Sequence, residues 1–178
     1  MIIVEGMDNT GKTTLIQRLI RDSKGRGYLR AIVSLGPNKP EHEQKDWARN
    51  QLYGPNIPMI YDRFLPICDI VYGGVLRGGS IWDIDSQYLK SLYSLKHPII
   101  IYCRPPKDVI LGFEDGRLQM EGVEDHGEEL VDKYDSIMAI LRNIGFEVIH
   151  YDYTQNSYDY LMYKIEKRLK RDYPTLIK

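Results

Sequence analysis

The sequence of 178 residues predicts a single α/β domain in which a five-stranded parallel sheet carries helices on both faces. Three observations support this prediction. Short apolar and β-branched runs alternate along the chain with longer segments of helical periodicity. The opening run MIIV is apolar at every position, as expected for a strand that is buried on both faces. Gly-Pro and Gly-Gly pairs separate several of the later segments, and no linker divides residues 1–178.

Each expected element follows from its local pattern. Strands are expected where apolar residues run together over a few positions, at 1–4, 29–35, 57–61, 98–103 and 146–151. Apolar residues at helical spacing predict a helix from residue 12, and the polar segment over 40–53 is expected to be helical because a proline opens it and Gly54-Pro55 ends it. Further helices are expected over 67–76, 83–96, 106–113, 128–142 and 157–173. Asp83 is the expected N-cap of the helix over 83–96. The stretch over 114–125 is polar and is expected to be flexible.

The stretch EGMDNTGKTT, directly behind the first strand, contains the phosphate-binding pattern Gly6-x-x-x-x-Gly11-Lys12-Thr13. The two glycines allow the backbone to curl so that its N–H groups converge on a polyphosphate. The helix that begins near Lys12 adds its positive N-terminal end. Strand, glycine loop and helix follow in the required order, which predicts the P-loop NTPase fold.

This motif also predicts the cofactors, ATP and Mg²⁺. Lys12 is expected to reach the β- and γ-phosphates and to act in catalysis, and the Thr13 hydroxyl is expected to ligate Mg²⁺. The expected nucleotide-binding residues are Gly6, Asn9, Thr10, Gly11, Lys12, Thr13 and Thr14.

Further candidate residues suggest an acceptor site. Asp62, at the end of an inner strand, is expected to associate with Mg²⁺, and the planar fork of Arg63 suits a second phosphate. Asp8 would repel phosphate, so we expect it to contact a sugar hydroxyl of the acceptor. Trp47 and Tyr72 are candidates for stacking on a flat base, and core or surface packing is the competing interpretation of Trp47.

The loop GMDNTGKTT and the stretch YDRF resemble the corresponding motifs of thymidylate kinases and their deoxynucleoside kinase relatives, with Phe64 in place of the usual tyrosine. The segment RPPKDVIL resembles the family's loop and helix after the fourth strand, with Lys107 in place of the usual acid. The resemblance implies that Tyr72 lies near the base. It also implies a lid at about 112–126, around EDGRLQMEGVED, from which Arg117 would act as the transition-state cation, with Arg104 as the next candidate.

The region between the second and third strands is shorter than in most thymidylate kinases, which suggests a compact, phage-type or otherwise divergent member. A hydroxyl acceptor benefits from a general base, but LGPN follows the second strand, and Glu41 and Glu43 come later. A monophosphate acceptor needs only positioning and charge neutralisation. The sequence therefore favours an ATP-dependent nucleoside monophosphate kinase, with dTMP as the first acceptor.

Two alternatives stay open. One is a deoxynucleoside or other small-molecule kinase on the same fold. The other is a GTPase-type switch, which is weaker because 104–107 reads RPPK where such proteins carry Asn-Lys-x-Asp.

Composition limits the kinds of partner and the cellular location that we expect. The formal net charge is −1 and no basic block occurs, which disfavours a nucleic-acid polymer as a partner. No apolar run is long enough for a membrane span, and no charged leader precedes the first strand. Cys68 and Cys103 lie in apolar surroundings, as expected for reduced thiols in a cytoplasmic protein. A small-molecule nucleotide is the expected partner, and a homodimer stays open.

Overall fold

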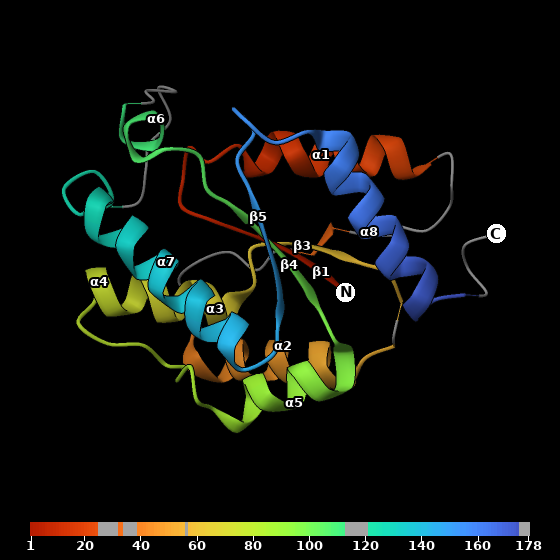
Figure 1. Cartoon of the computed structure of the whole chain (residues 1–178). Helices are drawn as coiled ribbons and strands as arrows, with labels where there is room; N and C mark the ends of the chain where they lie inside the picture. The colour runs from red at the N-terminus through yellow and green to blue at the C-terminus, as the bar shows by residue number, and fades with distance from the viewer. Residues whose placement is uncertain (25–31, 34–38, 56, 113–120, 175–178) are drawn as a thin grey trace.

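The computed structural model describes residues 1–24, 32–33, 39–55, 57–112 and 121–174. Its centre is a parallel sheet with the strand order β2-β3-β1-β4-β5, enclosed by helices (Figure 1). The strands are β1 (Ile2–Glu5), β2 (Ile32–Val33), β3 (Ile60–Asp62), β4 (Ile99–Cys103) and β5 (Glu147–Tyr151). β1 lies between β3 and β4, with Val4 in register with Asp62 on one side and with Ile101 on the other.

The sheet is smaller than the sequence predicts. Four strands of three to five residues form its body, and β2 adds only two residues at one edge. The rest of the strand expected over 29–35 lies outside the described residues. β3 begins at Ile60, so the strand expected from residue 57 starts three positions late. The five-strand prediction is therefore met only in part.

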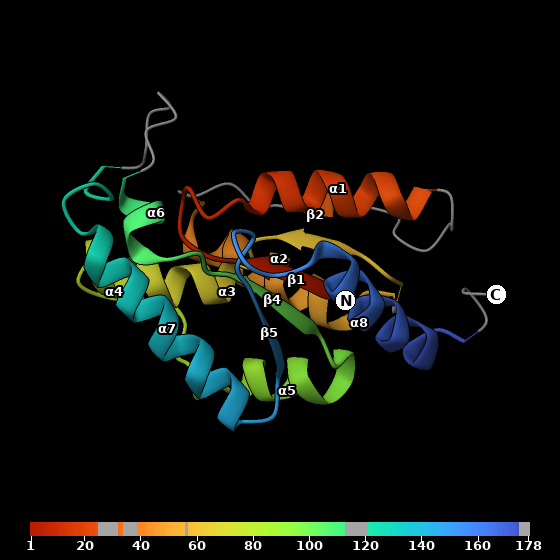
Figure 2. The ribbon, with the colours of Figure 1, turned by 45° about the horizontal axis from the view of Figure 1, so that its top comes forward.

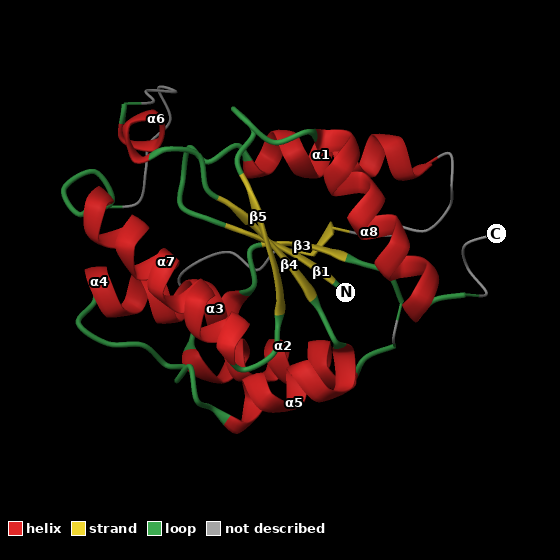
Figure 3. Ribbon diagram, viewed as in Figure 1, coloured by secondary structure: helices red, strands yellow, loops and turns green. Residues whose placement is uncertain are grey.

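Helices cover both faces of the sheet (Figure 2). α1 and α8 lie over one face, whereas α2, α3, α5 and α7 lie over the other (Figures 1 and 3). The helical segments are α1 (Lys12–Lys24), α2 (Glu41–Tyr53), α3 (Leu65–Cys68), a π-helical turn η1 (Asp69–Gly73), α4 (Gly74–Leu76), α5 (Gln87–Lys96), α6 (Lys107–Leu111), α7 (Gly127–Asn143) and α8 (Tyr158–Asp172).

Alternation along β1 divides the core between the two faces. Ile2 and Val4 pack with apolar residues of α1 and α8. Ile3 points the other way, into a larger cluster with residues of α2, α5 and α7. Each of these three side chains has no solvent exposure, so the strand that leads into the phosphate loop is held from both sides.

Two helix predictions need correction. The helix expected over 67–76 is a run in which α3, η1 and α4 follow one another, and periodicity alone does not reveal its π-helical turn. The helix expected from residue 83 begins at Gln87, because Ser86 is its N-cap and accepts a hydrogen bond from the Leu89 N–H at 3.4 Å. Asp83 instead accepts from the Asp85 N–H in a local turn.

Both cysteines are free thiols, and Cys103 is buried. Within the described ranges, none of the helices combines the length and the apolar character needed to cross a membrane.

Candidate active site

The phosphate loop after β1 has a backbone that only glycine permits at two positions. Gly6 has φ +142° and Gly11 has φ +79°. A Cβ atom on Gly6 would lie 2.5 Å from the carbonyl oxygen of Cys103, at the end of β4. Between the glycines, the Thr10 hydroxyl donates to the carbonyl oxygen of Met7 at 2.8 Å and braces the turn. The loop is therefore packed against the neighbouring strand.

The other end of the loop suits an anion. Asn9 and Gly11 both adopt positive φ, a feature of backbone nests that direct successive N–H groups into one concavity. α1 begins at Lys12, and its first regular helical bond runs from the Leu15 N–H to the Gly11 carbonyl oxygen at 3.0 Å. The N–H groups at the start of α1 have no carbonyl partner within the helix. Thr13 and Thr14 are exposed on this first turn, so the predicted residues fit a nucleotide polyphosphate.

The Lys12 side chain lies inside the loop. It is 7% exposed, and its Nζ donates to the Met7 carbonyl oxygen and lies 3.4 Å from Thr10 Oγ1. Burial lowers the pKa of its ammonium group to about 8, and the nearby Arg63 guanidinium acts in the same direction. A phosphate bound in the loop would raise this pKa and favour the charged form.

Three residues that the sequence predicts for the acceptor site lie together. The Arg63 guanidinium forms an ion pair with the Asp8 carboxylate, and the Tyr72 hydroxyl donates to Asp8 Oδ2 at 3.3 Å. The same guanidinium lies 5.3 Å from the centre of the Tyr72 ring, within the range of a cation–π interaction. Because Asp8 belongs to the phosphate loop, this cluster lies beside Lys12.

Arg63 has an unusual backbone for a residue with a side chain. Its φ is +63°, in the left-handed region, where an L-residue pays roughly 1–2 kcal/mol. Its N–H donates to the Val4 carbonyl oxygen of β1 at 3.0 Å. Such strain persists only where the surrounding structure holds it, and it is enriched at functional sites.

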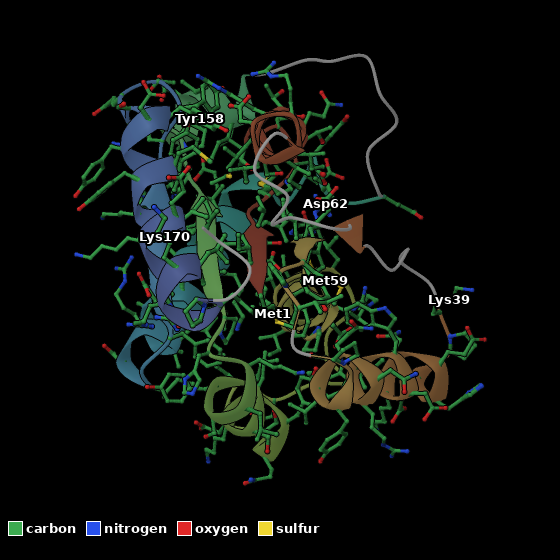
Figure 4. All side chains as sticks on the ribbon, turned by 90° about the vertical axis from the view of Figure 1, so that its right-hand side faces the viewer. Met1, Lys39, Met59, Asp62, Tyr158 and Lys170 are labelled. Atoms are coloured by element: carbon green, nitrogen blue, oxygen red, sulfur yellow. The ribbon has the colours of Figure 1, made fainter. Side chains whose placement is uncertain are left out.

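Asp62 precedes Arg63 at the end of β3. In Figure 4 it lies toward the α1 end of the sheet, and Met1 lies toward the opposite end. Within the described ranges, no three His, Cys, Asp or Glu side chains gather into a metal site. Thr13 and Asp62 stay the predicted Mg²⁺ ligands, and a nucleotide's phosphates would have to supply further oxygens.

The two aromatic candidates have different surroundings. Tyr72 is 3% exposed, and Tyr134 packs edge-on against its ring, so its hydroxyl reaches Asp8 but its ring has no open face. Trp47 is half-buried on α2, and its ring packs against Phe64 with centroids 5.5 Å apart. Phe64 follows Arg63, so Trp47 borders the acceptor cluster without joining it. Base stacking by either ring stays a prediction.

Of the two arginines considered for the transition state, Arg117 lies outside the described residues. Arg104 has partners already: its Nε and Nη2 each lie 3.0 Å from an oxygen of Asp135 on α7. The pKa of Asp135 is lowered, against the effect of its burial, by the hydrogen bonds from Arg104 and Tyr102. This bidentate pair gives Arg104 a structural role at the end of β4.

Glu5, the last residue of β1, is a site residue that the sequence analysis misses. Its carboxylate has no solvent exposure and accepts from the Phe64 N–H at 2.5 Å. Burial raises its pKa to about 7, even though that hydrogen bond and the charge of Arg63 favour ionisation. The signal available in the sequence is an acid directly between an apolar strand and the first loop glycine.

Tyr153, in the segment between β5 and α8, is a second residue that the sequence does not reveal. Its ring atoms lie 3.0 and 3.1 Å from the position that a Cβ atom would take on Gly11. The residue is 43% exposed, so an open aromatic ring borders the phosphate loop.

These features define a glycine loop with positive φ angles, joined to an adjacent cluster of opposite charges. No protein-family profile matches the sequence, and no curated protein matches it either. Solved structures do share its fold. The YorR protein of Bacillus subtilis, solved in complex with phosphorylated GDP, superposes with a TM-score of 0.69 and 21% identity, over 97% of this chain and 98% of that one.

Deoxyadenosine kinase from M. mycoides is also similar. With dCMP and dCDP bound it superposes with a TM-score of 0.57 and 18% identity, over 96% of this chain and 98% of the kinase. With dATP bound the TM-score is 0.52 at 19% identity, over 95% of this chain and 98% of the kinase. The chain therefore has the α/β fold of these proteins along nearly its whole length.

Proposed function

We propose that this protein is an ATP- and Mg²⁺-dependent nucleoside monophosphate kinase, with dTMP as the first acceptor to test. The observation that carries the proposal is the Arg63 guanidinium beside the phosphate loop. It adds a second cation to that of Lys12, as transfer between two phosphorylated molecules requires. The similarity to nucleotide-binding P-loop proteins supports the nucleotide as donor.

Separate groups of residues would bind the phosphate donor and the acceptor. The loop from Gly6 to Gly11 and the start of α1 bind the donor's phosphates through backbone N–H groups. Lys12, drawn from its contact with Met7, stabilises the charge that develops on the transferring group. Mg²⁺, when bound near Thr13 and Asp62, supplies further neutralisation of the β- and γ-phosphates.

On the acceptor side, an incoming phosphate competes with Asp8 for the Arg63 guanidinium. Asp8 then keeps the hydrogen bond that it accepts from the Tyr72 hydroxyl. Its other oxygen becomes free to accept a hydrogen bond from a sugar hydroxyl. The acceptor oxygen of a monophosphate is already anionic, so no general base is needed. Arg117, on the expected lid, is the proposed cation for the transition state.

A second candidate is phosphorylation of a deoxynucleoside. The similarity to deoxyadenosine kinase favours it. A hydroxyl acceptor needs a base within hydrogen-bond reach. Two carboxylates whose charges act on Lys12 already have partners: Asp8 pairs with Arg63, and Glu5 accepts from the Phe64 N–H. To serve as the base, Asp8 would have to leave its ion pair.

The test is a matrix of acceptors and donors with Mg²⁺, followed by product analysis. The acceptors are the four deoxynucleosides and their 5′-monophosphates, and the donors are ATP and GTP. The proposal expects a diphosphate product from at least one monophosphate with ATP, and none with Lys12→Ala. Products from nucleosides alone would establish the second candidate. Hydrolysis of GTP without any acceptor would establish a GTPase-type switch.

Asp8→Asn then tests the acceptor side. It keeps the shape of the side chain but removes the charge that pairs with Arg63. We expect it to raise the KM for the acceptor more than the KM for ATP. Asp85→Asn, in an exposed turn, is the matched control and should leave both constants unchanged. A larger effect on ATP would contradict the assignment of Asp8.

A further inference from the structure

Glu5 joins elements that surround the candidate site. It ends β1 on the same face as Ile3, and its side chain enters the apolar cluster beneath α3 and α7. One oxygen accepts from the Phe64 N–H at 2.5 Å; the other lies 3.4 Å from the Tyr134 hydroxyl and 3.6 Å from Cys68 Sγ. A fully buried carboxylate needs such donors, because an unpaired one would be costly.

The important contact is the one with Phe64, because it fixes the turn at Arg63. Two consecutive backbone N–H groups are held by two consecutive residues of β1: that of Arg63 by the Val4 carbonyl oxygen and that of Phe64 by the Glu5 carboxylate. Between them the peptide chain turns through the left-handed conformation of Arg63. The turn ends β3, starts α3 and sends the guanidinium toward Asp8.

We propose that Glu5 is a positioning residue for Arg63: by binding the Phe64 N–H it holds Arg63 in its left-handed conformation and aims the guanidinium at the acceptor. This inference rests on the acceptor role of Arg63 given under the proposed function. Glu5 itself is too deeply buried to touch an acceptor.

The groups around Glu5 make the positioning of Arg63 depend on whether the Glu5 carboxylate is ionised. They are the cations of Arg63 and Lys12, the Cys68 thiol of α3 and the Tyr134 hydroxyl of α7. Three donors converge on the carboxylate, which suits its ionised form. Protonation would weaken its bond to the Phe64 N–H. With a pKa of about 7, the positioning would weaken as the pH falls below neutral.

Three variants separate positioning from a general structural role. Glu5→Gln keeps an oxygen for the Phe64 N–H but cannot ionise. Glu5→Leu removes the acceptor and leaves the N–H buried. Tyr134→Phe is the matched control, because it removes a contact to the same carboxylate without touching the backbone at Arg63.

Steady-state kinetics give the first measurement. For Glu5→Leu we expect kcat/KM for the acceptor to fall about tenfold or more, the KM for ATP to stay within about twofold, and Tyr134→Phe to resemble the wild type. Glu5→Gln should retain most activity and lose the part of the acidic limb of the acceptor pH profile that belongs to Glu5. Equal effects on acceptor and ATP would overturn the inference.

Nuclear magnetic resonance gives a measurement that does not need turnover. The Phe64 amide proton should shift with pH near 7 in the wild type, stop shifting in Glu5→Gln and lose protection from exchange in Glu5→Leu. The Arg63 Nε signal should move in Glu5→Leu but not in Tyr134→Phe. An unresponsive Arg63 signal would overturn the positioning role even if no acceptor is found, whereas an inactive wild type with these shifts would overturn only the proposed function.

Discussion

The Arg63 guanidinium and the Asp8 carboxylate, 55 positions apart in the sequence, form an ion pair that joins the end of β3 to the phosphate loop. Both side chains are about one-third exposed or less. Under the proposed function, the phosphate of an anionic acceptor would replace Asp8 at the Arg63 guanidinium, and this exposure keeps the desolvation cost small.

The left-handed backbone of Arg63 predicts an unusual order of stability. Arg63→Gly should unfold at a higher denaturant concentration than Arg63→Ala, by about 1 kcal/mol in free energy, because both lose the ion pair and only glycine tolerates φ +63° without strain. At Arg49, on the exposed side of α2, the same two substitutions should give the reverse order, since glycine is a poor helix former. Equal stabilities at position 63 would contradict the strain.

Lys12→Ala should reduce kcat by at least 100-fold, corresponding to about 3 kcal/mol of transition-state stabilisation. The fold should survive, because the change removes a buried charge together with its desolvation cost. Lys45→Ala, on the exposed face of α2, is the control and should keep full activity, losing only an exposed pair with Glu41. Near wild-type turnover by folded Lys12→Ala would remove the kinase proposal.

The lowered pKa of Lys12 predicts an alkaline limb in the pH profile. Because kcat/KM for ATP reports the free enzyme, it should fall as the pH rises through about 8, where the ammonium group loses its proton. The profile of kcat should extend to higher pH, since bound phosphate stabilises the cation. In Lys12→Arg, whose guanidinium stays charged, the inflection near 8 should be absent. If it persists there, another group is responsible.

Gly6→Ala should destabilise the protein by about 3 kcal/mol. Its new methyl group would meet a backbone oxygen of Cys103 at 2.5 Å, and the positive φ of Gly6 adds strain. Gly79→Ala is the matched control, because nothing lies within 4 Å of its Cβ position and its φ is not in the left-handed region. Thermal unfolding of the two variants measures the difference. Similar melting temperatures would show that the loop can move away from β4.

The two arginines considered for the transition state should affect kcat and stability differently when each is replaced by alanine. Arg104→Ala should lower stability by about 1 kcal/mol through loss of its bidentate pair with Asp135, and it should leave kcat within severalfold. Arg117→Ala should lower kcat steeply with little change in melting temperature or ATP affinity. Kinetics and calorimetry on both proteins decide between them; a steep loss of kcat in Arg104→Ala alone would reverse the assignment.

The order of β1, phosphate loop and α1 was predictable because each depends on local sequence. The meeting of Asp8 with Arg63 was not, although both residues were candidates, because it depends on the register of β1 with β3 and on the left-handed turn. Glu5 was not predicted as a site residue because an acid at the end of a strand usually faces water. The start of α5 was misplaced because Asp83 and Ser86 are equally good N-caps, and only packing selects between them.

A Cβ atom on Gly6 would meet the Cys103 carbonyl oxygen, so the first glycine of the phosphate loop leaves no room between the loop and the end of β4, the strand paired with β1. The loop is thereby held against the sheet itself. A core substitution that widens the gap between β1 and β4, several residues from any ligand, would enlarge the radius of the loop. Under the proposed function, such a substitution should therefore weaken nucleotide binding although it lies in the core.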